Sequence, residues 1–245
     1  MLLFQQSLQD SVFTGNDTQG SLQIKKRFRF FSQVPMHCTL CSNRKPVLWA
    51  KDHFRAYFKC PECNLVFVPD KFHLSPDKEK ERYDLHNNDP EDEGYKNFLN
   101  RLILPLIPYL KKGDKGIDFG SGPTPSISIL MKKRGFSVTN YDPFYSNKKD
   151  VLNQTYDFLT CVETVEHFHH PQKEWKRMIG MVKPGKWIGV MTQLLTDEID
   201  FRDWYYNKDV THVCFYSKAT FEWLALKHGF KINYMSNSVL LFQVG

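Results

Sequence analysis

The sequence predicts an α/β protein with a mixed sheet and a small cysteine-rich module in front of it. Beyond Lys112, short apolar runs alternate with helical runs, a pattern that favours a parallel sheet covered by helices. The final runs, KINYM and VLLFQV, are separated only by three polar residues, which predicts a terminal antiparallel hairpin. Two C-x2-C pairs near the start predict the separate module.

Four segments follow from these patterns. Residues 1–35 are polar and then basic and aromatic, and are expected to be a flexible leader, with Met36 as an alternative start. A cysteine-rich module covers 36–74, and a helical lead-in or lid covers 75–112, opened by Ser75-Pro76 and interrupted at Pro105. The sheet domain covers 113–245, with strands at 116–119, 136–141, 157–162 and 187–192, and helices at 125–134, 172–182 and 217–228.

Composition limits the class of protein. The chain has 245 residues, of which 41% are hydrophobic, enough for one medium domain with an appendage. Because no apolar run approaches the roughly 18 to 20 residues that a membrane span needs, we expect no membrane partner.

The start MLLFQQSLQD lacks a basic region before its apolar residues, which favours a cytoplasmic location. The net charge of +6 would help an anionic partner approach but is small for a dedicated nucleic-acid binder.

The cysteine spacing predicts a structural zinc site. Cys38 and Cys41 form one C-x2-C pair, and Cys60 and Cys63 form another, the spacing of two knuckles around a tetrahedral Zn²⁺ ion. Four thiolates leave no open position for catalysis. A pair of disulfides is the alternative, which a reducing cytoplasm disfavours. Cys161 and Cys214 are expected to be small buried residues.

The stretch GIDFGSGPTP, residues 116–125, predicts a strand that runs into a glycine turn. Glycines in such a turn let the backbone approach a cofactor, and an acidic residue about 20 positions later binds ribose hydroxyls. Asp142 stands 22 residues after Gly120 at the end of an apolar strand. Thr124 occupies the position of a third glycine, and we expect it to cap the following helix.

These residues resemble the class I S-adenosylmethionine-dependent methyltransferases. The resemblance covers about residues 95–245 and rests on D-x-G-x-G from Asp118, on Asp142, on YDFLTCVETVEHFHHP and on VKPGKWIGVMT. It implies a Rossmann-like seven-stranded mixed sheet with helices on both faces. In VKPGKW, Lys186 replaces a glycine of the family pattern.

The resemblance also implies a set of cofactor contacts. The turn would lie against the methionine part of S-adenosylmethionine, Asp142 would hold the ribose, and Asp150 is a weaker candidate for the adenine side. Glu163 would border cofactor and acceptor, and Asp118 would organise the turn near the amino group. Tyr83 and Asn87, together with His86 and Tyr95, form either a lid over the cofactor or an ordinary charged helix with a polar end. The predicted cofactor-binding residues are Asp118, Gly120, Ser121, Gly122, Asp142, Pro143, Glu163, Tyr83 and Asn87.

Acceptor chemistry is predicted for the segment WYYNKDVTHVCFYS. His212 is the first candidate for a general base, and Tyr205 and Tyr206 are candidates for shaping the acceptor pocket. A lone loop histidine is also compatible with a structural role. His167, His169 and His170 are interpreted as loop residues rather than metal ligands.

The sequence therefore predicts an S-adenosylmethionine-dependent methyltransferase that carries structural Zn²⁺ and acts on a small-molecule, metabolite or sugar-like acceptor. An rRNA or tRNA base methyltransferase is the first alternative, favoured by the basic aromatic leader. A non-catalytic binding protein with the same fold is the second. A nicotinamide-binding enzyme is disfavoured because the third fingerprint glycine is missing.

Overall fold

A computed structural model of the protein describes residues 36–85 and 88–245. Residues Met36–Gly245 form one compact unit. The predicted leader, and His86 and Asn87 of the predicted lid, lie outside the described residues.

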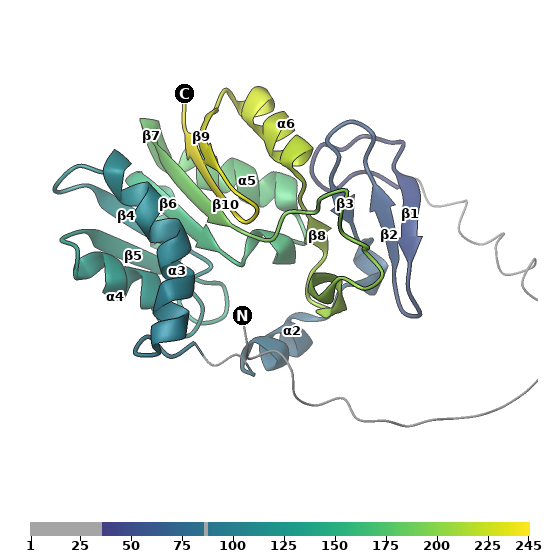
Figure 1. Ribbon diagram of the computed structural model, residues 1–245, viewed down its shortest axis with the longest axis horizontal. Coiled ribbons are helices and arrows are strands. Elements are labelled where there is room, and N and C mark those ends of the chain that lie inside the picture. Colours follow the sequence, from purple (N-terminus) through teal and green to yellow (C-terminus); the bar gives the residue numbers. More distant parts are fainter. Residues whose placement is uncertain (1–35, 86–87) are drawn as a thin grey trace, which may run out of the picture. The chain divides into compact units, whose positions relative to one another are not determined.

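The larger sheet has the order β5-β4-β6-β7-β10-β9 (Figure 1). Strands β5, β4, β6 and β7 run parallel, and β10 is antiparallel to both of its neighbours. The predicted terminal hairpin is thus confirmed, with its second strand inserted beside β7. The strand bounds are β4 Lys115–Phe119, β5 Ser137–Tyr141, β6 Tyr156–Val162, β7 Val182–Met191, β9 Lys231–Met235 and β10 Val239–Gln243.

The expectation of seven strands is wrong for the described residues, because this sheet has six. The segment between β5 and β6 is short and does not reach the sheet edge as a strand. Instead, Asp142 and Ser146 close a tight turn by a β-bridge, and a 3₁₀ helix, η4, follows at Lys149–Asn153. Strand β5 is therefore left as the edge of the sheet.

Helices cover both faces of the sheet, as predicted (Figure 1). On one face, α3 (Glu93–Leu106) packs against β7 and β10, and α4 (Ser126–Lys132) packs against β5 and α3. Both helices share a buried cluster with Val239 and Leu241 of β10. On the other, α5 (Pro171–Gly180) and α6 (Lys218–His228) pack against Leu240 and Phe242. Successive residues of β10 point to opposite faces of the sheet, so this one strand contributes to both cores.

Local sequence sets the helix ends. Helix α6 begins at a capping box between Ser217 and Thr220 and ends at Gly229, whose φ of 71° suits glycine. Helix α3 contains Pro105 one residue before its end and continues as a 3₁₀ helix, η3, at Ile107–Tyr109. Helix α2 covers Pro76–Tyr83, and three further 3₁₀ helices are η2 Asp70–Phe72, η5 Val165–His167 and η6 Tyr205–Lys208.

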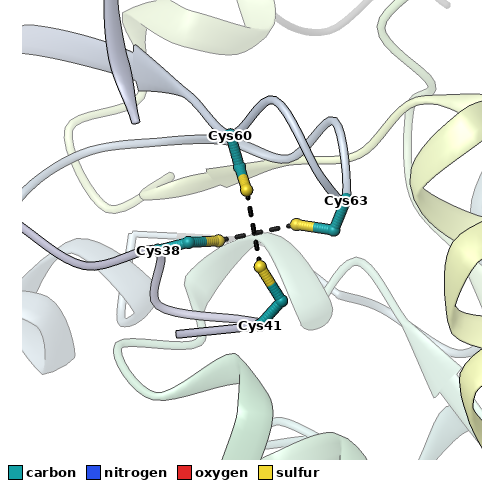
Figure 2. A group of neighbouring side chains, drawn as sticks. All are labelled: Cys38, Cys41, Cys60 and Cys63. Carbon is teal, nitrogen blue, oxygen red and sulfur yellow. Dashed lines mark hydrogen bonds between the residues drawn. The ribbon is translucent and has the colours of Figure 1, made fainter. Parts of the chain in front are cut away.

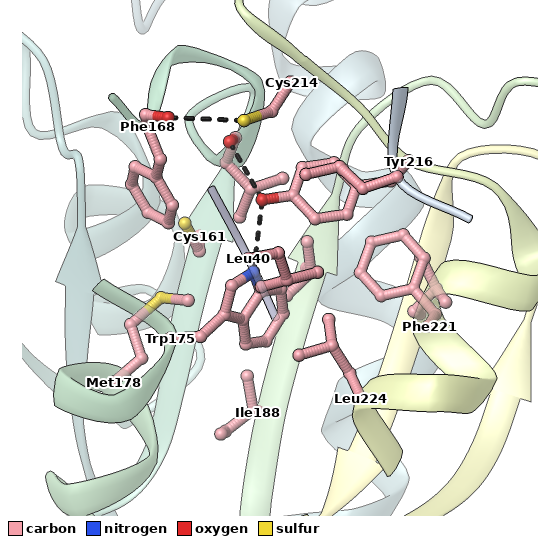
Figure 3. Packing of buried hydrophobic residues seen from close by; sticks show 14 of the residues in the cluster. Leu40, Cys161, Phe168, Trp175, Met178, Ile188, Cys214, Tyr216, Phe221 and Leu224 are labelled. Atoms are coloured by element: carbon pink, nitrogen blue, oxygen red, sulfur yellow. Dashed lines mark hydrogen bonds between the residues drawn. The ribbon is translucent and has the colours of Figure 1, made fainter. Parts of the chain in front are cut away.

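A second sheet joins the cysteine-rich segment to the rest of the chain. Its order is β1 (Val47–Lys51), β2 (Ala56–Lys59), β3 (Val66–Phe67) and β8 (Cys214–Phe215), with β3 and β8 antiparallel. Leu40 of this segment belongs to the same buried cluster as Trp175 and Tyr216, and Figure 3 shows it among them. The cysteine-rich segment therefore shares the core of one face of the larger sheet.

Cys161 and Cys214 are buried, as predicted; Cys214 lies in this cluster, where its thiol donates to the carbonyl oxygen of Phe168. Within the described ranges, no helix has the length and apolar character that a membrane crossing requires.

Candidate active site

The glycine turn follows β4 directly. The backbone N–H groups of Gly120 and Ser121 both donate to the carbonyl oxygen of Tyr141, at 2.8 and 3.1 Å. Gly120 has a φ of 83° and Gly122 a φ of 65°, values that favour glycine. A Cβ on Gly120 would lie 2.3 Å from the Thr164 side chain. The turn is therefore both left-handed and closely packed at Gly120.

Asp142 links this turn to the end of β5. Its Oδ2 accepts a hydrogen bond from the Gly122 N–H at 3.0 Å. Its Oδ1 accepts from the N–H groups of Phe144 and Tyr145, at 2.8 and 3.1 Å, while Pro143 is exposed within the same turn. Oδ1 thus accepts two hydrogen bonds, whereas Oδ2 accepts one and keeps a second lone pair. Asp142 can therefore organise both loops and still accept a hydrogen bond from a ligand through Oδ2.

Asp118 is a buried carboxyl group below the turn. The Thr160 hydroxyl donates to it at 2.7 Å. Burial raises the pKa of Asp118 to about 7, the hydrogen bond from Thr160 opposes that rise, and the nearby Asp142 adds to it. This carboxyl group therefore titrates near neutral pH.

Glu163 stands just after β6 in an unusual backbone conformation. Its φ is 45°, a region that non-glycine residues rarely occupy and that is often found at functional sites. The Tyr206 hydroxyl lies 3.3 Å from Oε2, and Oε1 is buried without a hydrogen-bond partner among residues 36–85 and 88–245. Burial, followed by the negative charge of Glu166, raises the pKa of Glu163 well above its ordinary value.

Helix α2 ends beside the Asp142 turn. The Tyr83 ring has its centroid 5.6 Å from that of Phe144 and 5.2 Å from that of His167. Tyr145 donates its hydroxyl to Asp84 at 2.6 Å. Tyr83 is thus placed next to the predicted ribose-binding turn.

Thr124 does not cap the next helix, contrary to our expectation. The N-cap of α4 is Pro125, and it makes no side-chain cap hydrogen bond. The carbonyl oxygen of Thr124 instead accepts from the Ser126 N–H at 2.8 Å. The two flanking prolines fix the chain here, so the helix begins one residue later than a Thr124 cap would require.

Tyr206 lies between two carboxylates. Its hydroxyl is 2.5 Å from Oε1 of Glu166 and 2.9 Å from the Thr192 hydroxyl, which donates to Oε2 of Glu166 at 3.0 Å. Glu166 is completely buried. A buried carboxylate held by two hydroxyl donors is a polar network at the carboxyl edge of β6 and β7, where ligands bind in α/β sheets.

His212 and His167 lie together beside this network. Their ring centroids are 4.7 Å apart, and the rings of His212 and Tyr206 are 4.2 Å apart. Burial and the neighbouring His212 lower the pKa of His167 to about 4. Burial raises the pKa of Asp209, but the nearby His212 and the hydrogen bonds from Thr211 outweigh this effect and lower the pKa to about 2. The structure therefore brings the two predicted catalytic residues, Tyr206 and His212, into contact.

The cysteine-rich segment supports this loop through Arg55, which is buried. Its Nη1 donates to the carbonyl oxygens of Val210 and His212, both at 3.0 Å. Its Nη2 donates to the carbonyl oxygens of Asn207 and Asp209. One guanidinium thus satisfies four backbone acceptors of the loop that carries His212.

The four predicted zinc ligands converge on one point (Figure 2). Their Sγ atoms all lie within 4.8 Å of one another, with 3.5 Å between Cys38 and Cys63 and 3.4 Å between Cys41 and Cys60. A tetrahedral Zn²⁺ with Zn–S bonds of about 2.3 Å requires about 3.8 Å between sulfurs. The thiols are free, and the donor set fits zinc.

Sequence reasoning missed several residues of the site. Glu166 lies in YDFLTCVETVEHFHHP and Thr192 ends VKPGKWIGVMT, but nothing in either stretch singles these two residues out. Arg55 stands in a loop between short strands, and no spacing signals its partners more than 150 positions away. These contacts depend on the pairing of β3 with β8.

The parallel sheet, the glycine turn and the acid after the second strand define a nucleotide-cofactor-binding α/β protein. Residues 92–234 match the family described as "Methyltransferase domain". This match covers more than half of the chain, and the chain belongs to that family. Its α/β fold is the methyltransferase fold.

Three solved structures illustrate the range of similar chains. A protein from Pyrococcus horikoshii OT3 is 16% identical, with 67% of this chain and 99% of that chain covered and a TM-score of 0.45. Magnesium protoporphyrin IX methyltransferase from Synechocystis PCC 6803, with bound SAH, is 13% identical, with 72% and 97% covered and a TM-score of 0.48. The calicheamicin-biosynthesis methyltransferase CalO1, with SAH bound, is 12% identical, with 62% and 55% covered and a TM-score of 0.44. This chain thus aligns with only about half of CalO1. No curated protein matches the chain.

Proposed function

We propose that this protein is an S-adenosylmethionine-dependent methyltransferase with a small-molecule acceptor. The observation that carries the proposal is the hydrogen bond between Asp142 and the Gly122 N–H. It joins the glycine turn and the acidic residue, the two elements that a nucleoside cofactor needs, at the carboxyl edge of the sheet.

The cofactor would contact the turn from Gly120 to Gly122, with its ribose hydroxyls on Asp142. Asp118, buried behind the turn, would interact with the amino group. Tyr83, which lies beside Phe144, would cover the ribose side as part of a lid. The bound cofactor supplies a methyl group on a sulfonium, and the protein needs mainly to hold the acceptor in line and exclude water.

The acceptor would bind on the side of Glu163 and Tyr206. The unpartnered Oε1 of Glu163 is a buried acceptor atom that a hydroxyl or amino group can satisfy. Tyr206 and His212 remain predicted catalytic residues. The modest net charge of +6 supports a small molecule over RNA, and the cytoplasmic location remains a prediction from the sequence.

We also propose that Cys38, Cys41, Cys60 and Cys63 hold a structural Zn²⁺ ion. The proposal is supported by the convergence of four thiols and by the burial of three of them. Zinc would fix the two cysteine knuckles, and through β3 and Arg55 it would support the His212 loop.

Calorimetry with S-adenosylmethionine and with its demethylated product tests the cofactor. We expect both to bind the wild-type protein, and Asp142→Ala to weaken both by at least tenfold. Absence of binding by the wild-type protein would reject the proposal. Acceptors are then separated by methyl transfer to pooled metabolites or to ribosomal RNA. Transfer to RNA that falls steeply with added salt would favour the RNA alternative.

A further inference from the structure

Two histidines and a glutamate gather beside the predicted acceptor side, apart from the four cysteines. One ligand atom from each of Glu166, His167 and His212 lies within 4.8 Å of the other two. The three residues come from two segments: Glu166 and His167 from the loop after β6, and His212 from the loop before β8. A side-chain set of two imidazoles and one carboxylate is a common ligand set for first-row divalent metals.

The hydrogen bonds of the two histidines orient them as ligands. Nδ1 of His167 contacts the carbonyl oxygen of Thr211 at 3.2 Å, and Nδ1 of His212 contacts the carbonyl oxygen of Tyr206 at 2.7 Å. A carbonyl oxygen only accepts, so these contacts place the proton on Nδ1 of each ring. The Nε2 atoms then carry the lone pairs that bind a metal, and a backbone carbonyl on the other nitrogen is the usual support for a histidine ligand.

Glu166 is oriented in the same way. Its two oxygens accept from the hydroxyls of Tyr206 and Thr192, and ligating carboxylates are commonly held by such hydrogen bonds. Glu166 is completely buried, and no lysine or arginine of residues 36–85 or 88–245 forms an ion pair with it. A buried carboxylate of this kind calls for a compensating positive charge.

We infer that Glu166, His167 and His212 form a second metal site, which binds one divalent transition-metal ion such as Zn²⁺ or Co²⁺. Three protein ligands leave at least one position for an oxygen ligand, as in catalytic rather than structural zinc sites. Binding through Nε2 makes His212 a ligand instead of a general base, because the same lone pair cannot do both. The inference rests on the geometry of metal binding and not on the proposed methyl transfer, although it replaces the predicted role of His212 as a base.

Metal content of the full chain tests the inference. After saturation with Co²⁺ and removal of free metal, the wild-type protein should hold two equivalents. His212→Ala and Glu166→Gln should each hold one, and that one should keep the intense sulfur-to-cobalt charge-transfer band of the four-thiolate site. His228→Ala, an exposed histidine outside the cluster, is the matched control and should hold two.

Each outcome is decisive for one site. A wild-type protein that holds a single thiolate-bound equivalent at saturation overturns the inference, as does a His212→Ala variant that keeps two. Loss of the thiolate band with retention of a second, sulfur-free equivalent would instead reject the four-cysteine site alone. If His212→Ala does not fold, titration of the wild type decides: a second spectral change without a thiolate band supports the site, and its absence rejects it.

Discussion

Arg55 donates a hydrogen bond from Nη1 to the carbonyl oxygen of His212 at 3.0 Å, across 157 positions of the chain. The same guanidinium also binds three other carbonyl oxygens of the loop that carries His212. The cysteine-rich segment therefore reaches the candidate active site through one buried side chain. The cysteine-rich segment is therefore not only a separate module, because it also holds the loop that carries His212.

Replacing Arg55 should weaken both the fold and the loop. Arg55→Met removes the donor to four backbone carbonyl groups, and we expect the free energy of unfolding to fall by about 3 kcal/mol. Arg55→Lys should recover only part of that loss, because an ammonium group lacks the planar fork. Urea denaturation gives the measurement. Arg134→Met is the control, at an exposed arginine with two hydrogen bonds, and it should change the free energy of unfolding by less than about 1 kcal/mol. A loss as large as that of Arg55→Met would contradict the stabilising role of Arg55.

Asp118 should make the protein less stable as the pH rises. Burial raises the pKa of Asp118 from its ordinary value of 3.8 to about 7 in the folded protein. The folded protein therefore favours the protonated form, and the free-energy cost of ionising Asp118 on folding grows as the pH rises between those two values. Asp118→Asn removes that cost and keeps an oxygen to accept from Thr160. We expect its stability relative to wild type to increase by about 2 kcal/mol between pH 5 and pH 8.

Urea midpoints at the two pH values check this expectation. A difference between variant and wild type that does not change with pH would show that Asp118 keeps an ordinary pKa. The same variant should bind S-adenosylmethionine more weakly at pH 8, because the carboxylate proposed near the amino group is gone.

Gly120→Ala should disrupt the cofactor turn. The added Cβ would meet the Thr164 side chain at 2.3 Å, and φ at this position is 83°. We expect a loss of at least tenfold in affinity for S-adenosylmethionine, measured by calorimetry. Gly135→Ala is the matched control, because its φ is 86° and no atom of the described residues lies within 4 Å of the added carbon. It should lose about 1 kcal/mol of stability from backbone strain but keep its affinity. Equal affinities for the two variants would rule out a specific role of the Gly120 turn.

If the four cysteines hold zinc as proposed, its removal should destabilise the whole described unit. Leu40 and the cysteines belong to the same buried cluster as Trp175 and Tyr216, so loss of the ion exposes a core shared with α5 and α6. We expect Cys60→Ser to bind one fewer metal equivalent and to lose on the order of 5 kcal/mol. Cys161→Ala should lose core packing but no metal. Calorimetric melting with and without a chelator is the measurement, and an unchanged midpoint would argue against a structural ion.

Much of the fold could be predicted because the apolar runs are periodic and are separated by glycine and polar residues that are typical of turns. The predicted hairpin ends the strand order. Its second strand, within VLLFQV, lies between β7 and β9 because a strand that is apolar on both faces can be buried on both only in the interior of the sheet. The expectation of a seventh strand came from the resemblance alone. It failed because the residues after Asp142 fold into a turn and a 3₁₀ helix.

The sequence by itself determined the local pieces: the glycine turn, the acid that follows β5 and the paired cysteines, whose spacing is a property of adjacent residues. Only the tertiary structure decided which distant groups meet. The pairing of β3 with β8 brings Arg55 to the His212 loop, and the parallel alignment of β6 with β7 places Glu166 against Thr192 and Tyr206. Such contacts join segments far apart in the chain, so their energies depend on packing and burial that no local pattern records.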